Sequence, residues 1–386
     1  MWRYHNPVRV VFGAGAFDDL PTHIGSRAWG LVTYSDSYFR QLAARLKNMA
    51  GAPAVVIDDV AANPDYALLE DQCARIARAG EPEVWVALGG GSVIDSTKVF
   101  AAANGNFANV RTFLETGTGV DALSATPIIA VPTTAGTGSE VTSWATVWDA
   151  GSARKYSLAR PGLYPEVALV EPALMAGKPR DLTVSTGLDA LSHALESLWN
   201  VNANPVSAAF AVQAAREVLE TLPLLARDLA NIELRTRMAR ASLFAGFAFS
   251  NTKTAIAHSI SYPITLRHNV PHGIACSFTL PLVIRSVSGR SDLCDSSLRQ
   301  IFGKGLDKAS EQLAKFLDSL GVTTIPADYG VGPEEWMAIV TDAVGGERGL
   351  NFIGETQRLF KEALALGAST ASTDSAMAPR AVRQGA

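Results

Sequence analysis

The sequence predicts two domains, an N-terminal α/β domain with a mostly parallel sheet over residues 1–179 and an all-α domain over residues 180–366. In the first half, short runs of β-branched and apolar residues alternate with helix-length segments, which is the pattern of a parallel sheet covered by helices on both faces. Beyond about residue 180, apolar residues recur at helical spacing and no segment has a strand pattern. With 386 residues, 48% of them apolar, the chain can bury a core in each domain.

The first half contains five apolar runs that we interpret as strands. They alternate with helical segments, and this order predicts parallel pairing through crossover helices. The Gly-Ala-Gly sequence at 13–15 lacks the third glycine and the acidic partner of a dinucleotide fingerprint, so we interpret it as a turn. The expected strands are 8–12, 29–33, 54–57, 84–88 and 128–131, and the expected helices are 37–49, 66–79 and 93–103.

The second half predicts helices. Leu188, Leu191, Leu195 and Leu198 recur every three or four residues, which places them on one face of a helix. Further helices are expected at 205–224, 232–262, 308–320 and 333–345. The tail at 367–386 is rich in Ala, Ser and Thr with little to bury, and we expect it to be disordered.

The composition excludes several classes of partner. The chain has 33 basic and 37 acidic residues and a net charge of −4, so neither nucleic acid nor an anionic membrane is expected to bind it. The apolar run at 243–249 is too short to cross a bilayer, and the N-terminus lacks the apolar stretch of a signal peptide. The three cysteines lack CxxC spacing and are interpreted as reduced thiols. These properties predict a soluble cytoplasmic protein.

Two short segments contain the residues of one expected metal site. Asp189 and His193 are four residues apart on an expected helix, so both side chains lie on one face. His258 and His272 supply two more imidazoles, in a chain with only six histidines. One carboxylate and three imidazoles without a thiolate suit a divalent cation such as Fe2+ or Zn2+ and leave a coordination position for substrate. A surface Asp-His pair is the alternative interpretation of the first segment taken alone.

A glycine run follows the strand expected at 84–88. The sequence Gly-Gly-Gly-Ser at 89–92 opens a helix, where exposed backbone N–H groups and the absence of side chains favour a bound pyrophosphate. One turn further along, Asp95 and Lys98 can face the substrate side of a cofactor or brace the turn. A plain tight turn is the alternative interpretation of the glycine run.

A segment rich in threonine and glycine, at 132–142, follows the next strand. Its hydroxyls suit hydrogen bonds to phosphate, ribose and carboxamide groups, although taken alone it is equally typical of a flexible loop. Two such loops at consecutive strand ends share the edge at which open α/β sheets bind ligands. We therefore expect a dinucleotide to bind between them.

Four motifs taken together resemble the iron-containing (group III) alcohol dehydrogenase family. They are GGGSVIDSTK at 89–98, PTTAGTGSEVT at 132–142, TGLDALSHALE at 186–196 and VPHG at 270–273. Their order and spacing extend the resemblance over residues 7 to about 365. It implies an N-terminal dinucleotide-binding domain, a C-terminal helical metal-binding domain and an active-site cleft between them.

The resemblance also implies roles for individual residues. One divalent metal, Fe2+ or Zn2+, would be bound by Asp189, His193, His258 and His272. The cofactor would be NAD or NADP. Its pyrophosphate would be held by Gly90, Gly91 and Ser92, with Thr133, Thr134 and Thr137 lining it, Lys155 near its ribose and Asp95 on its substrate side.

Two positions depart from the family pattern. Many members have a histidine four residues after the third metal ligand, near the nicotinamide or in a proton relay, and this chain has Tyr262 there. A tyrosine has an unperturbed pKa of about 10, so Tyr262 either takes over the relay or leaves it to water. NAD-preferring members place an aspartate directly after the strand expected at 29–33. This chain has Tyr34 there and Asp36 two residues later, which leaves the choice between NAD and NADP open.

Local segments at 141–149, 155–158 and 249–263 are similar to the phosphonoacetaldehyde reductase branch, which reduces that aldehyde to 2-hydroxyethylphosphonate. A phosphonate requires cationic or amide donors near the metal, and Lys253, Arg267 and His268 flank the ligand segment. We therefore expect Lys253 and Arg267 to contact the substrate, with ordinary solvated charges as the alternative.

The expected reaction is hydride transfer between a nicotinamide and a small aldehyde or alcohol. The alternatives that keep the fold are an iron-type alcohol dehydrogenase for uncharged short-chain substrates, a dehydroquinate synthase-like or glycerol-1-phosphate dehydrogenase-like enzyme, and a metal-independent maleylacetate reductase. A non-catalytic nucleotide-binding scaffold is the alternative outside enzymes. The ligand set accepts Fe2+ and Zn2+ alike. Because members of the family are commonly dimers or larger, we expect a homo-oligomer.

Overall fold

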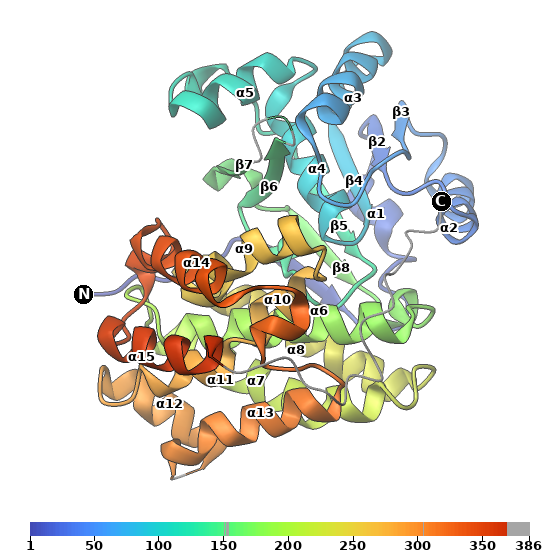
Figure 1. Ribbon diagram of the computed structural model, residues 1–386. Coiled ribbons are helices and arrows are strands. Elements are labelled where there is room, and N and C mark those ends of the chain that lie inside the picture. Colours follow the sequence, from blue (N-terminus) through green and yellow to red (C-terminus); the bar gives the residue numbers. More distant parts are fainter. Residues whose placement is uncertain (150, 152–153, 304, 369–386) are drawn as a thin grey trace.

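A six-stranded parallel sheet organises the first half of the computed structural model, which describes residues 1–149, 151, 154–303 and 305–368 (Figure 1). The strands follow the order β1-β8-β5-β4-β2-β3, and each neighbouring pair is parallel. The predicted α/β fold class is thereby confirmed. The strands are β1 (Arg9–Phe12), β2 (Trp29–Val32), β3 (Val55–Ile57), β4 (Val84–Gly89), β5 (Ile128–Pro132) and β8 (Val167–Val170).

Both faces of this sheet are covered, which explains why its strands have almost continuous apolar sequences. Every residue of β2, β4, β5 and β8 is buried. Side chains alternate along β4, so that Val86 and Leu88 pack in one core and Trp85 and Ala87 in another. The helices of this half are α1 (Leu20–Ile24), α2 (Ser37–Ala50), α3 (Tyr66–Ala79), α4 (Gly91–Ala103) and α5 (Phe107–Thr116).

The strand order reverses between β2 and β4. From β2 the chain runs to β3 on one side and then returns to β4 on the other side of β2. Loops that leave the carboxyl ends of such a strand pair diverge and form the crevice in which open α/β sheets bind ligands. The glycine run at 89–91 lies at the end of β4, and Tyr34 follows the end of β2.

Two features of this half were not predicted from the sequence: β8 and a two-stranded antiparallel hairpin beside the sheet. The hairpin consists of β6 (Trp144–Asp149) and β7 (Arg154–Ala159), and its register pairs Trp148 with Lys155. In β6, Ala145 and Val147 are buried, whereas the alternate residue Thr146 is half-buried. The hairpin packs against α4, which follows the glycine run. It therefore brings Lys155 to the side of the sheet that carries the predicted cofactor loops.

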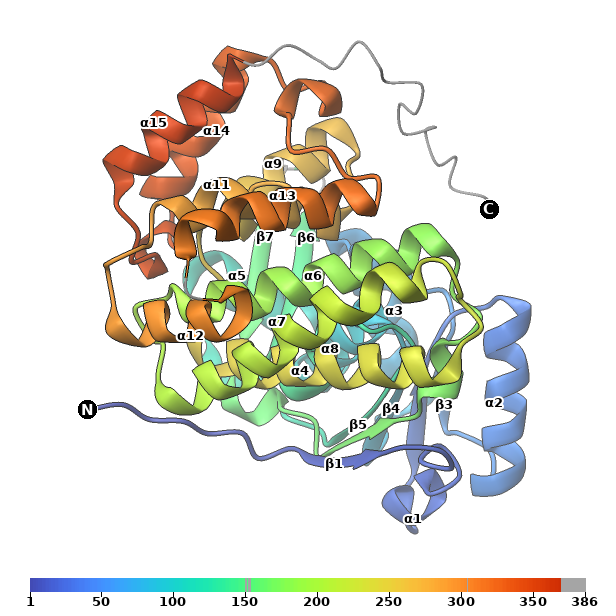
Figure 2. The same cartoon turned by 90° about the horizontal axis from the view of Figure 1, so that it is seen from below.

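From Arg180 onward, the described residues form helices and turns and no named strand, as predicted. In Figure 1 these helices lie below the sheet, and Figure 2 shows α6, α7 and α8 packed side by side. No described helix is long and apolar enough to cross a membrane. The helices are α6 (Arg180–Leu198), α7 (Pro205–Leu225), α8 (Ile232–Thr252), α9 (Ile256–His268), α10 (His272–Ser277), α11 (Leu280–Arg285), α12 (Asp292–Phe302), α13 (Ala309–Ser319), α14 (Pro333–Gly345) and α15 (Thr356–Gly367).

The prediction of one continuous helix at 232–262 is wrong, because α8 ends at Thr252 and α9 begins at Ile256. Lys253 ends α8 with a φ of 64°, in the left-handed region that residues with a side chain rarely adopt. The N-cap residue of α9 contributes no capping side chain. Instead, the buried carboxylate of Glu196 in α6 accepts hydrogen bonds from the backbone N–H groups of Ala257 (2.6 Å) and His258 (3.2 Å). A capping group from a distant helix is invisible to local periodicity.

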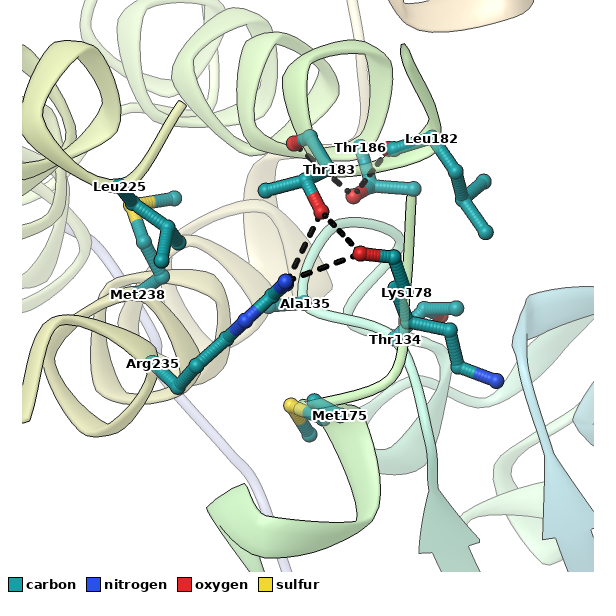
Figure 3. A pocket seen from close by; sticks show the side chains of 10 residues that line it. All are labelled: Thr134, Ala135, Met175, Lys178, Leu182, Thr183, Thr186, Leu225, Arg235 and Met238. Carbon is teal, nitrogen blue, oxygen red and sulfur yellow. Dashed lines mark hydrogen bonds between the residues drawn. The ribbon is translucent and has the colours of Figure 1, made fainter. Parts of the chain in front are cut away.

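The two halves meet at a small apolar core and at one buried arginine. A pocket at this junction is lined by Thr134 from the threonine-rich loop and by Thr183 and Thr186 from α6 (Figure 3). Arg235 of α8 donates hydrogen bonds to Thr183 Oγ1 (2.9 Å) and to the backbone oxygen of Lys178 (3.0 Å). These bonds fix the start of α6 against α8. The domain boundary at 179/180 remains a prediction, and residues 369–386 of the expected disordered tail lie outside the described residues.

Candidate active site

Three of the four predicted metal ligands converge in a buried cluster. Asp189 of α6, His258 in the first turn of α9 and His272 at the start of α10 gather there, together with Cys276. Their potential ligand atoms all lie within 4.8 Å of one another. Asp189 and His258 are only 5% and 2% exposed. This spacing allows the side chains to share a single ion.

His193 borders that group. Its Nε2 lies 3.8 Å from Asp189 Oδ1, and its ring centroid lies 4.6 Å from that of His258. The other face of the His193 ring stacks on Phe249 at 4.0 Å. The spacing of four residues therefore places Asp189 and His193 together, as predicted from the helix.

The expectation of a site without sulfur is not met in the structure. Cys276 lies one turn after His272 on α10, and its Sγ is 3.6 Å from His272 Nε2. The cysteine is free and buried, in agreement with the interpretation as a reduced thiol. No sequence motif distinguishes Cys276 from the other two cysteines. The one sequence signal that predicts its place at the site is its spacing of four residues from His272, which puts both on one helical face.

The donor atoms of the cluster lack internal partners. Asp189 Oδ1, His193 Nδ1 and His258 Nε2 are buried, and none has a hydrogen-bond partner among the described residues. Asp189 Oδ1 and His258 Nε2 lie 3.4 Å apart without hydrogen-bond geometry. Each buried polar atom left unpaired costs about 1–3 kcal/mol. A divalent cation would satisfy Asp189 Oδ1 and His258 Nε2, so the residues present fit a metal.

Glu196 fixes the orientation of His258. Its Oε2 lies 2.6 Å from His258 Nδ1, and the carboxylate also accepts the N–H groups at the start of α9. With Nδ1 bonded to a carboxylate, Nε2 faces Asp189. A carboxylate behind a ligating histidine sets its tautomer and raises its basicity as a ligand. Glu196 was not predicted from the sequence, although an acidic residue three positions after His193 on an apolar helix was a usable signal.

The protonation states of Asp189, His193 and His272 suit metal ligands. Burial lowers the pKa of His272 to about 3 and that of His193 to about 4, so both imidazoles are neutral at physiological pH. Burial alone would raise the pKa of Asp189, but the neighbouring His193 and His258 outweigh it and hold this pKa well below its usual range. An ionised carboxylate and neutral imidazoles are the forms that bind divalent metals. Burial alone would lower the pKa of His258, but the neighbouring Cys276 and Glu196 outweigh it and raise this pKa above its usual value.

The approach of α10 to α6 requires Gly273. A Cβ at this position would lie 1.8 Å from the backbone oxygen of Ser185. Any side chain would push α10 away and move His272 out of reach of Asp189. The glycine of the VPHG motif is therefore explained by packing at the cluster.

The two loops predicted to bind a dinucleotide lie in contact. A Cβ on Gly91 would lie 2.6 Å from the side chain of Thr137, and one on Gly90 would lie 3.2 Å from that of Thr134. The hydroxyl of Thr133 is buried without a hydrogen-bond partner among the described residues. These contacts place the threonine-rich loop directly over the glycine run. The binding roles of these residues and of Ser92 remain predictions.

Tyr34 lies at the same edge. Its hydroxyl interacts with Ser92 of the glycine run, and its ring packs at 5.0 Å against Phe39. Burial raises the pKa of Tyr34, so the phenol is neutral. Asp36 accepts the N–H groups of Tyr38 and Phe39 and thereby caps α2. The position at which NAD-preferring members place an acid is thus occupied by a neutral phenol.

Asp95 and Lys98 brace the loop. The Lys98 ammonium is buried and donates to the backbone oxygens of Ser139 (2.7 Å) and Trp144 (2.8 Å), among other acceptors. Asp95 accepts hydrogen bonds from Ser139 Oγ (2.6 Å) and from the backbone N–H of Thr146 (2.8 Å). Of the two roles considered for this pair, these bonds match bracing. A contact between Asp95 and cofactor remains a prediction.

Tyr262 lies beside the metal cluster between two cations. Its ring is parallel to that of His272, with centroids 5.9 Å apart. Lys155 Nζ lies 3.7 Å from the centre of the Tyr262 ring, and Arg348 Cζ lies 5.0 Å from it. Burial raises the pKa of Tyr262, but Arg348 and Lys155 outweigh it and lower this pKa below its usual value. Tyr262 is therefore a better proton donor than an isolated tyrosine, and its relay role remains a prediction.

The cations predicted to contact the substrate lie on the surface. The side chain of Lys253 is 59% exposed and 3.9 Å from Glu347, and that of Arg267 is 64% exposed and 3.4 Å from Glu335. Their geometry is that of solvated ion pairs, which is the alternative considered for them. The cations that the fold brings to Tyr262 are Lys155 and Arg348, and no motif marks Arg348.

Comparison with known proteins agrees with this geometry. Residues 7–172 match the iron-containing alcohol dehydrogenase family, and residues 183–358 match the C-terminal part of the same family. The chain belongs to the iron-containing alcohol dehydrogenase family. Membership confirms the predicted enzyme class, an oxidoreductase acting on alcohol and aldehyde groups.

Individual relatives span most of the chain. NAD-dependent methanol dehydrogenase of Bacillus methanolicus is 30% identical over 87% of this chain and 91% of its own. Phosphonoacetaldehyde reductase of Streptomyces viridochromogenes is 37% identical over 60% of each chain. The crystal structure of sulfoacetaldehyde reductase from Bifidobacterium kashiwanohense, in complex with NAD+, superposes with a TM-score of 0.87 at 31% identity, covering 96% of this chain and 99% of that one.

Proposed function

We propose that this alcohol dehydrogenase reduces a small anionic aldehyde, with phosphonoacetaldehyde as the first candidate, using NADH or NADPH. The observation that carries the proposal is the buried cluster of Asp189, His258 and His272, with unpaired donor atoms, bordered by His193. Fe2+ or Zn2+ bound there would act as a Lewis acid on the carbonyl oxygen.

The residues of the chain would divide the remaining work. The loops at 89–92 and 132–142 would hold the cofactor so that its nicotinamide faces the cluster. Glu196 would keep His258 in its ligating orientation. Hydride transfer to the carbonyl carbon requires one proton on the oxygen, and Tyr262, whose pKa is lowered by Lys155 and Arg348, would donate it.

The names of two relatives support an anionic substrate. Phosphonoacetaldehyde and sulfoacetaldehyde both consist of an acetaldehyde with an anionic group, and the reductases so named are 37% and 31% identical to this chain. An uncharged short-chain alcohol is the second candidate, because a methanol dehydrogenase is 30% identical over 87% of the chain. The resemblance also supports our proposal of a cytoplasmic homodimer or larger assembly, which sedimentation velocity would measure.

Loss of one ligand tests the proposal. We expect His258→Ala to lose bound metal and at least about a thousandfold in kcat/KM, because the Lewis acid contributes several kcal/mol to the transition state. Metal would be measured by mass spectrometry, and turnover by nucleotide absorbance with phosphonoacetaldehyde and propanal, each with NADH and with NADPH. His5→Ala, which changes an exposed histidine, is the matched control. Full activity of His258→Ala in chelator-treated buffer would contradict the proposal.

A further inference from the structure

Two cations converge next to the metal cluster from different parts of the chain. Lys155 comes from β7 of the hairpin, and Arg348 comes from the segment just before the 3-10 helix η7 (Gly349–Asn351). Both lie over the ring of Tyr262, at 3.7 Å for Lys155 Nζ and 5.0 Å for Arg348 Cζ. The Tyr262 ring is in turn parallel to that of His272. The pair therefore lies one aromatic ring away from a predicted metal ligand.

Neither cation is neutralised by a carboxylate. Arg348 uses Nε to donate a hydrogen bond to Thr254 Oγ1 (2.8 Å). Within the part of the chain that the structure describes, neither Arg348 nor Lys155 forms an ion pair with an acidic side chain. The charge of Asp95 does interact with that of Lys155, but both Asp95 oxygens already accept hydrogen bonds, from Ser139 and Thr146.

Two unneutralised cations in a partly buried recess repel each other. Burial lowers the pKa of Lys155, Tyr262 opposes this shift, and the neighbouring Arg348 adds to it. A like-charge arrangement of this kind is costly unless an anion joins it, and an anion would be attracted by both groups. Other cations of the chain show the contrast: Arg240 and Arg285, for example, lie beside Glu217 and Glu362.

We propose that Lys155 and Arg348 bind the anionic group of the substrate, so that an acidic substituent one carbon from the aldehyde directs the carbonyl toward the metal ligands. The proposal rests on the proposed function, specifies its substrate class and gives Lys155 a substrate contact in addition to the ribose contact that the family resemblance implies. A guanidinium presents parallel N–H groups that match a phosphonate or sulfonate, and the ammonium adds a point charge. Because a single ring separates the pair from His272, the site selects short aldehydes.

Substrate discrimination tests this assignment. In the metal-loaded enzyme with its preferred nucleotide, kcat/KM would be measured for phosphonoacetaldehyde, sulfoacetaldehyde and uncharged propanal. We expect Arg348→Gln and Lys155→Met each to lower the ratio of anionic to neutral kcat/KM by about 10- to 100-fold, the range for loss of a charged hydrogen bond. Arg348→Lys should retain part of the preference. The dianionic phosphonate should lose more than the sulfonate.

Arg299→Gln is the matched control, because it removes an exposed arginine paired with Asp295 on α12. We expect its ratio to equal that of the wild type. An equal loss for anionic and neutral aldehydes in Arg348→Gln would overturn the proposal. So would a loss confined to the KM for the nucleotide, which would assign the pair to the cofactor.

Binding of ethylphosphonate, which has no aldehyde, separates this proposal from the proposed function. Calorimetry with the metal- and NAD+-loaded wild type should show binding that weakens at least about tenfold in Arg348→Gln, with circular dichroism confirming the fold. Binding by a wild type that reduces no aldehyde would support the anion site and refute the activity. Ethylphosphonate affinity unchanged by both substitutions would refute the anion site.

Discussion

The bracing cluster around Lys98 and the metal cluster around Asp189 are both buried and charged, yet they differ in hydrogen-bond saturation. Lys98 donates to four oxygen acceptors, and both oxygens of Asp95 accept internal hydrogen bonds. In the metal cluster, Asp189 Oδ1 and His258 Nε2 have no hydrogen-bond partner among the described residues. A saturated polar cluster stabilises the fold, whereas an unsaturated cluster is completed by a ligand.

Burial alone does not separate the two clusters. It lowers the pKa of Lys98 to about 8 and that of His272 to about 3, and the same desolvation acts on both groups. A search for perturbed titratable groups would therefore identify both as functional. The distinction rests on whether each polar atom has a partner.

The largest expected effect concerns the saturated cluster. Lys98→Met leaves Asp95 buried without the nearby positive charge and removes three hydrogen bonds to the threonine-rich loop and one to Trp144 of β6. We expect the free energy of unfolding to fall by about 3–5 kcal/mol, the range for removing one of two opposite buried charges that interact. Urea denaturation measures this free energy. The control is Lys315→Met, which changes an exposed lysine and should alter the free energy of unfolding by less than about 0.5 kcal/mol. If Lys98→Met kept its stability but lost affinity for the cofactor, Lys98 would be a ligand-binding group. That result would contradict the contrast between the two clusters.

The second expected effect concerns the carboxylate behind the metal cluster. Glu196→Gln keeps the shape of the side chain but removes the charge that orients His258 and caps α9. We expect metal affinity to fall by about 10- to 100-fold, the usual range for such partners. Competition with a chromogenic chelator measures the affinity. The exposed Glu311→Gln serves as control, and equal affinities of Glu196→Gln and wild type would show that Glu196 is needed only for folding.

The sequence predicted what depends on local pattern. Apolar runs identified five strands of the sheet. Of these, β2, β4 and β5 are buried throughout, and a strand buried on both faces must be almost wholly apolar. The equally apolar and buried β8 was missed. The spacing of four residues between Asp189 and His193 correctly placed both on one helical face. The four motifs at 89–98, 132–142, 186–196 and 270–273 correctly predicted the family, since residues 7–172 and 183–358 match it.

The sequence did not predict features set by tertiary contacts. The break between α8 and α9 depends on Glu196, which lies about sixty residues earlier in the chain. The half-polar β6–β7 hairpin has no continuous apolar run, so the pattern of a fully buried strand does not identify it. Cys276 and Arg348 reach the site through packing of α10 and of the segment before η7, and no motif marks either of them.

The smallest expected effect tests the surface cation that the sequence favoured. Arg267 is 64% exposed and pairs with Glu335 at 3.4 Å, so solvent screens its charge. We expect Arg267→Gln to change kcat/KM for phosphonoacetaldehyde by less than about twofold, because exposed ion pairs contribute at most about 1 kcal/mol. The assay is the one used for Arg348→Gln, so the two arginines are compared directly. Arg267→Gln could instead lose activity only with the anionic aldehyde, to the same extent as Arg348→Gln. That result would mean that surface charges also bind the substrate, so the recess beside Tyr262 would not be the sole determinant of substrate choice.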